Sequence, residues 1–150
     1  MKKIIFLILI TIIISGCSKE EFTSKSCNMK ENNIRTTFNL TATNKKINKV
    51  VMKIEMDNSL LKVESLEILD DKQKTEIKEN VLKSLGLDRD EYEGINIEVV
   101  INKTIIITIN ADLNKADKEI LKKIGMDFTD ADLSLKRTVK SLEEKGAICN

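Results

Sequence analysis

Residues 34–42 and 50–56 alternate apolar with polar or small side chains, which is the two-residue period of a half-buried strand. Asn44-Lys45-Lys46 separates the two stretches and is typical of a turn. If Thr43 pairs with Ile47 across a three-residue loop, the apolar side chains of both strands share one face. The pattern therefore predicts an antiparallel hairpin, in which the opposed pairs are Leu40 with Val50, Phe38 with Met52 and Ile34 with Met56.

A second alternating pair covers residues 95–101 and 105–111, with apolar residues at the odd-numbered positions. A two-residue turn would place Ile97 opposite Thr108 and would separate the two apolar faces. A three-residue loop or a bulge instead places Ile97 opposite Ile109. We therefore expect an odd-length connection in this hairpin.

Three further segments carry apolar residues at helical spacing, each between a polar start and a glycine. The expected starts and ends are Asp70, in a capping box with Gln73, to Gly86; Asn114 to Gly125; and Asp132 or Ser134 to Gly146. Residues 59–69 fit neither period, so this stretch could extend the second strand or begin a helix.

The predicted order of elements is therefore ββ-α-ββ-α-α. Hairpins form antiparallel sheets, and amphipathic helices bury their apolar stripe against one face of such a sheet. We expect an α+β fold, a two-layer sandwich in which an antiparallel sheet of two hairpins carries helices packed on one face.

Residues 1–16 have the layout of a signal peptide, since Lys2 and Lys3 precede an uncharged apolar run at 4–14. As a helix the run spans about 16 Å, against ~30 Å for a bilayer core, and is too short to cross comfortably. The ending, Ile14-Ser15-Gly16-Cys17, resembles the lipobox of bacterial lipoproteins. The resemblance implies that residues 1–16 are removed and that the Cys17 thiol carries a diacylglyceryl group. There are two alternatives. One is an ordinary secretory peptide that has a cysteine at this position by coincidence, and the other is an uncleaved membrane anchor.

Residues 17–26 are then the lipidated cysteine and a polar, flexible tether, and residues 27–150 form a single domain. Two acyl chains anchor a protein stably, whereas one binds a membrane marginally. The predicted location is the outer leaflet of the bacterial cell membrane, facing the extracytoplasmic side. Because the charges balance, we expect the lipid rather than a basic surface to hold the domain there.

Cys27 and Cys149 remain as an even pair outside the cytosol, and they bracket the expected domain. A disulfide between them would close most of the chain into one loop and contribute on the order of 5 kcal/mol in the chain-entropy model. Two free thiols in a reducing setting are the alternative. The spacing does not resemble a redox-active Cys-x-x-Cys pair.

The composition excludes several classes of function. With 25 Lys and Arg against 24 Asp and Glu there is no basic footprint for nucleic acid, and four Phe with one Tyr are too few to stack bases. The absence of His removes an imidazole base, a Ser-His-Asp triad and His-containing zinc sites. No phosphate loop or serine-nucleophile motif occurs, so neither a cofactor nor a catalytic residue is assigned.

Acidic clusters are the remaining candidates for chemistry. The run at 88–93 fails as an EF-hand loop, because Glu93 stands where glycine is needed and Val99 where the final glutamate is needed. A second cluster before the last helix is expected to cap that helix or face solvent. The residues of this second cluster are Asp127, Asp130 and Asp132. Neither cluster is assigned as a metal site.

Several features together resemble the YehR-like small bacterial lipoproteins: the lipobox cysteine, a short tether, Cys27 opening the first strand, and the lysine-rich first turn at 44–46. The closing helix adds the pattern Leu-x-x-x-Val-x-x-Leu-x-x-x-Gly at Leu135, Val139, Leu142 and Gly146. The resemblance implies a two-layer α/β sandwich at the cell surface. It implies no activity, because that family has none assigned.

We therefore expect a non-enzymatic, lipid-anchored extracytoplasmic protein that binds a partner protein or a small ligand, and whose membrane contact is made through Cys17. One alternative function is a carboxylate-dependent hydrolase of the cell envelope, with Asp88, Asp90 and Asp127 as the side chains to test. A purely structural role in the envelope is the other.

Overall fold

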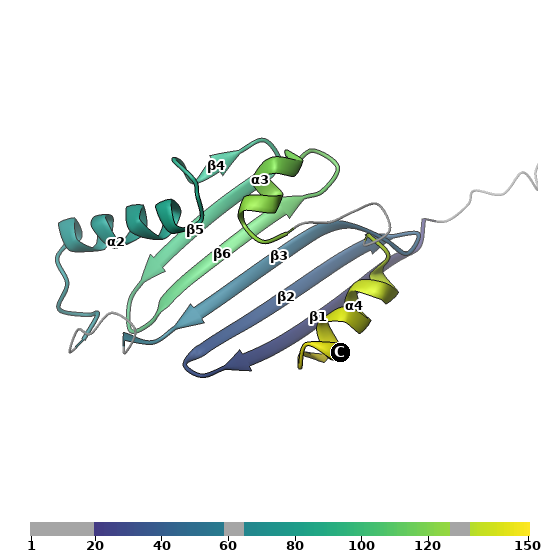
Figure 1. Cartoon of the computed structure of the whole chain (residues 1–150), viewed down its shortest axis with the longest axis horizontal. Coiled ribbons are helices and arrows are strands. Elements are labelled where there is room, and N and C mark those ends of the chain that lie inside the picture. The colour runs from purple at the N-terminus through teal and green to yellow at the C-terminus, as the bar shows by residue number, and fades with distance from the viewer. Residues whose placement is uncertain (1–19, 59–64, 127–132) are drawn as a thin grey trace, which may run out of the picture.

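The computed structural model describes residues 20–58, 65–126 and 133–150 (Figure 1). In these parts of the chain seven strands form one antiparallel sheet, in the order β4-β5-β6-β3-β2-β1-β7. The strands are β1 (Phe22–Glu31), β2 (Ile34–Thr43), β3 (Lys46–Met56), β4 (Glu91–Tyr92), β5 (Ile95–Ile101), β6 (Ile105–Asp112) and β7 (Ile148–Cys149). The helices are α2 (Asp71–Ser84), α3 (Lys118–Lys123) and α4 (Leu135–Glu144).

The three helices lie on the same face of the sheet, with α2 and α3 beside β5 and β6, and α4 over β1 and β2 (Figure 1). Each contributes one buried leucine to a single apolar core: Leu82, Leu121 and Leu135 respectively. The sheet contributes the alternating side chains of β2, β3, β5 and β6, of which Leu40, Ile47, Ile97 and Ile109 are almost fully buried. Burial of this aliphatic surface on one face is what holds the two layers together.

The predicted α+β class with helices on one face is confirmed. The order ββ-α-ββ-α-α and the two-hairpin sheet are wrong, because β1, β4 and β7 add three strands. Strand β1 begins at Phe22, so residues 22–26 of the expected tether are strand instead. All ten residues of β1 pair with β2, and backbone hydrogen bonds rather than apolar burial hold it, since Cys27 is its one fully buried residue.

The predicted registers of both hairpins are confirmed. Leu40 lies opposite Val50 in the first hairpin, and Ile97 lies opposite Ile109 across a three-residue connection in the second. The predicted loop of the first hairpin is wrong. Ala42, not Thr43, pairs with Ile47, because β3 has a bulge there and the turn has only two residues.

The predicted capping box of α2 is confirmed: the Gln73 backbone N–H donates to Asp70 Oδ1 at 2.8 Å, and the Asp70 N–H donates to Gln73 Oε1 at 3.0 Å. Helix α3 starts later than expected, because Asp117 rather than Asn114 is its N-cap. Ser134 precedes α4, as predicted for one of its two candidate starts. The candidate start at Asp132 and most of the ambiguous stretch, residues 59–64, lie outside the described residues.

Candidate ligand groove and lipid attachment site

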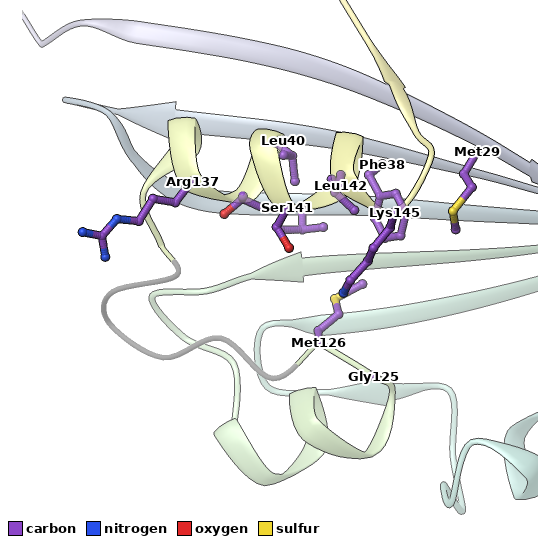
Figure 2. Close-up of a pocket in the computed structure, with 11 residues that line it drawn as sticks. Met29, Phe38, Leu40, Gly125, Met126, Arg137, Ser141, Leu142 and Lys145 are labelled. Atoms are coloured by element: carbon purple, nitrogen blue, oxygen red, sulfur yellow. The ribbon is translucent and has the colours of Figure 1, made fainter.

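A groove of about 460 Å³ lies between α4 and the end of α3, on the helix-bearing face of the sheet (Figure 2). Its floor is apolar, because Phe38 and Leu40 of β2 lie beside Val50 of β3. Met29 of β1 lines it further along the same face, and Met126 lines it where the chain leaves α3. Its volume is within the range of small-molecule sites, which run from about 300 to 1,000 Å³.

Helix α4 forms the wall of the groove that lies opposite the end of α3 (Figure 2). Thr138, Ser141, Leu142 and Lys145 line the groove, and their spacing of three and four residues places them on one side of the helix. Arg137 lines the groove near the start of the helix (Figure 2). Helix α4 and its C-cap Lys145 therefore contribute one apolar, two hydroxyl and two cationic side chains to the lining. The Arg137 side chain extends away from the groove floor, at its rim (Figure 2).

Backbone contacts at both ends fix α4 against the sheet. At its start the Leu135 N–H donates to the Lys45 carbonyl at 3.0 Å, and the Ile47 N–H donates to the Leu133 carbonyl at 2.7 Å. Beyond its end β7 pairs with β1, and Asn150 exchanges two backbone hydrogen bonds with Ser26. The wall of the groove is thus tied to β1 and to the β2–β3 turn, which favours a preformed site.

A disulfide joins Cys27 to Cys149, as predicted. It connects β1 to β7 directly after α4, and Cys149 Sγ lies 4.0 Å from the Val139 carbonyl oxygen of that helix. Since Cys27 is fully buried, this bond is part of the core rather than an exposed redox centre. The bond also holds the end of the groove wall in place.

The charged side chains among the described lining residues of the groove are all cationic. Arg137 and Lys145 both line it, and no acidic side chain stands among its described lining residues. Such a combination of apolar floor and cationic rim suits a ligand with an apolar body and an anionic group. Sequence periodicity did not indicate this site, because its two sides come from strands and a helix far apart in the chain.

Two of the carboxylates singled out by the sequence, Asp88 and Asp90, have different hydrogen-bond partners. Asp88 accepts a hydrogen bond from the Tyr92 hydroxyl at 2.6 Å, which lowers the pKa of that carboxyl. Asp90 accepts a hydrogen bond from Lys78 Nζ at 2.9 Å, which lowers the pKa of Asp90 as well. Both are therefore held as anions, the opposite of what a general acid requires. Asp127 lies outside the described residues.

The described residues form neither a metal-binding cluster nor a membrane-spanning helix. Within 20–58, 65–126 and 133–150, no three His, Cys, Asp or Glu side chains gather as a metal site. Among those residues, no helix has the length and hydrophobicity to cross a bilayer.

The lipobox, Ile14-Ser15-Gly16-Cys17, lies outside the described residues. Residues 1–18 match the family model for the prokaryotic membrane lipoprotein lipid attachment site. The chain is therefore a membrane-anchored lipoprotein, and the match covers all four predicted lipobox positions.

Comparison with solved structures places the fold. The NMR structure of the E. coli YehR protein is similar with a TM-score of 0.65 and 11% sequence identity, over 87% of this chain and 92% of that chain. An NMR structure of a protein from Streptococcus pneumoniae TIGR4 is similar with a TM-score of 0.56 and 13% identity, over 91% of this chain and 90% of that chain. No curated protein matches the sequence. The predicted resemblance is thus confirmed in its fold, and the chain is a lipoprotein with the fold of YehR.

Proposed function

We propose that this lipoprotein is a non-enzymatic binding protein of the bacterial envelope, held on the outer leaflet through Cys17 and facing the extracytoplasmic side. We further propose that the groove along α4 receives a small amphiphile with an apolar chain and one anionic group. The single observation that carries the ligand class is the lining itself, in which an apolar floor meets Arg137 and Lys145 and no carboxylate stands among the described lining residues.

The disulfide supports the extracytoplasmic side, because structural disulfides persist in oxidising compartments and are rare in the cytosol. The lipid attachment site supports the anchor, because two acyl chains give stable membrane binding. Replacing Cys17 by Ala should therefore move the protein from the membrane pellet to the soluble fraction. A variant that still pelleted after a carbonate wash would contradict anchoring through this residue.

Binding to the groove is tested with a fluorescent long-chain carboxylic acid and the mature chain carrying Cys17→Ala. Ser141→Trp adds a large ring to the exposed side of α4 that lines the groove, and should weaken binding by about tenfold, the effect of roughly 1.4 kcal/mol of lost contact. Lys140→Trp is the matched control, because Lys140 lies on the same helix, is exposed, and does not line the groove. Equal weakening by both variants would remove the groove from the proposal.

The ligand's charge is tested separately. Arg137→Gln with Lys145→Gln should weaken binding of the carboxylic acid but leave the corresponding uncharged alcohol unaffected, since only the acid gains charge-assisted hydrogen bonds. If acid and alcohol bind the parent protein equally well, the ligand is apolar and the cations have no part in its recognition.

The hydrolase hypothesis stays a prediction. No described feature favours it, because Asp88 and Asp90 are each engaged with a different partner.

A further inference from the structure

The chain leaves its lipid anchor at one defined end of the sheet. The Asn44 N–H donates to the Glu21 carbonyl at 2.9 Å, and the Glu21 N–H donates to Asn44 Oδ1 at 3.2 Å. The polypeptide is thus fixed to the β2–β3 turn as early as Glu21. Four residue steps from Cys17 reach at most about 14 Å when extended. The β2–β3 turn is therefore confined to the neighbourhood of the lipid headgroups.

Exposed lysines surround this point of attachment. Lys45 and Lys46 lie in and directly after the turn, and both are exposed. The start of α4 lies at the same end of the sheet (Figure 1). The Leu135 N–H donates to the Lys45 carbonyl, and the backbones of Lys46 and Ser134 form an isolated antiparallel β-bridge. This brings the exposed Lys136 to the same end. We call Lys45, Lys46 and Lys136 the basic corner.

The lysines of the basic corner have no ion-pair partner among the described residues. Ion pairs among the described residues join Lys53 to Glu55, Lys78 to Asp90 and Lys140 to Glu144, so none of them uses a lysine of the corner. The three lysines of the basic corner outnumber the two described acidic neighbours at the chain exit, Glu20 and Glu21. Phe22 follows them with 69% of its surface exposed, so its ring is available for contact.

We propose that the basic corner docks on the anionic headgroups of the membrane that holds the anchor, with Phe22 at the interface. Anionic lipid attracts basic residues only within about one Debye length of roughly 8 Å. The link from Cys17 reaches at most about 14 Å, so it allows the corner to come within that distance of the headgroups. Exposed aromatic and basic side chains together are the pattern of interfacial binding. The formal net charge of +1 gives no sign of the basic corner, because acidic residues elsewhere in the chain balance the charge of its lysines. The proposal rests on the lipid attachment site and is independent of the groove.

Docking fixes the orientation of the domain. The opposite end of the sheet, with Lys30 at the end of β1 and Lys103 in the β5–β6 loop, would point away from the membrane. The groove along α4 would then stand beside the bilayer surface and open sideways, rather than being pressed against it.

The test measures acetylation of individual lysines by a water-soluble reagent, read by mass spectrometry, on the full lipidated protein in vesicles. The vesicles contain phosphatidylcholine alone or phosphatidylcholine mixed with phosphatidylglycerol. We expect Lys45, Lys46 and Lys136 to react about fivefold more slowly on the anionic vesicles, because this factor corresponds to the attraction of one cation to an anionic membrane surface. This protection should vanish at high salt, which screens the attraction. Lys30 and Lys103 are exposed internal controls and should react equally on both.

A charge-reversal pair completes the test. Lys46→Glu with Lys136→Glu should remove the protection of Lys45, whereas Lys30→Glu with Lys103→Glu should leave it intact. All four substitutions are at exposed positions, so folding is not at stake. Equal reactivity of the corner on both kinds of vesicle would overturn the proposal, as would protection of both ends to the same extent. Ligand binding in the groove is measured without vesicles, so its failure is a separate result.

Discussion

Cys27 and Cys149 are directly opposite each other in the β1–β7 pair, although 122 positions separate them along the chain. Cys27 is completely buried, and the Ser26 and Asn150 backbones exchange hydrogen bonds of 3.2 and 2.9 Å beside the bond. The end of the chain is thereby fastened to its first strand.

Reducing this disulfide should lower the free energy of unfolding by about 2–5 kcal/mol, because the unfolded chain regains the freedom of a very long loop. The measurement is urea unfolding of the same protein with and without reductant. Cys27→Ser with Cys149→Ser is the control, and its unfolding midpoint should not respond to reductant. Equal midpoints for the oxidised and reduced parent would show that the bond adds nothing to stability.

Ile109 and Ile106 lie on the same strand but face opposite sides of the sheet. Ile109 is fully buried in the core, whereas Ile106 is half-buried on the face without helices. Ile109→Ala should cost about 2–5 kcal/mol, because it leaves a cavity among packed side chains. Ile106→Ala should cost clearly less in the same urea titration. The reverse order would mean that the register of β6 is shifted by one residue.

Gly94 and Gly86 have nearly the same backbone conformation, with φ of +70° and +72°, but different surroundings. A Cβ at Gly94 would lie 2.6 Å from the Ala116 backbone nitrogen, whereas at Gly86 it would meet only Lys123 Cδ at 3.9 Å. Gly86→Ala should therefore cost about 1–2 kcal/mol from its left-handed φ alone. Gly94→Ala should cost more, because the backbone of the neighbouring loop must move. Thermal unfolding of the two variants side by side tests this difference.

The ion pair between Lys78 and Asp90 joins α2 to the segment before β4. Since this contact lowers the pKa of Asp90 in the folded state, its stabilising effect is present at neutral pH and is lost as the pH falls through that lowered value. Asp90→Asn should therefore destabilise the protein at neutral pH, and its difference from the parent should shrink on acidification below the ordinary value of 3.8. Lys78→Met, which removes the other partner, should behave alike. A difference that grew with acidity would contradict this assignment.

Much of the sheet is readable from the sequence because one of its faces is buried. Alternation fixes which residues of β2, β3, β5 and β6 point inward, and only one register lets Leu40 meet Val50 and Ile97 meet Ile109. The turn of the first hairpin is not readable in the same way. A bulge next to a two-residue turn gives the same inward pattern as a three-residue loop.

The family resemblance places a strand that opens at Cys27, but the side-chain pattern does not indicate β1 or its start at Phe22. Its side chains Lys25, Asn28 and Lys30 are exposed and Cys27 is fully buried, so no apolar alternation marks the strand. The strand is held by backbone hydrogen bonds to β2, and the order of side chains in the sequence does not reveal such bonds. The groove was missed for a different reason, since the sequence does not say that the end of α3 and one side of α4 flank the same part of β2.

The bond at Cys27 also has a mechanical consequence. Drag on a domain held by its amino end pulls on β1 first, starting at Phe22. Residues 22–26 can peel away from β2, but at Cys27 the tension passes into a covalent link to β7. Beyond Cys27, β1 can therefore be pulled from the sheet only together with β7, which distributes the load from the lipid anchor over both strands.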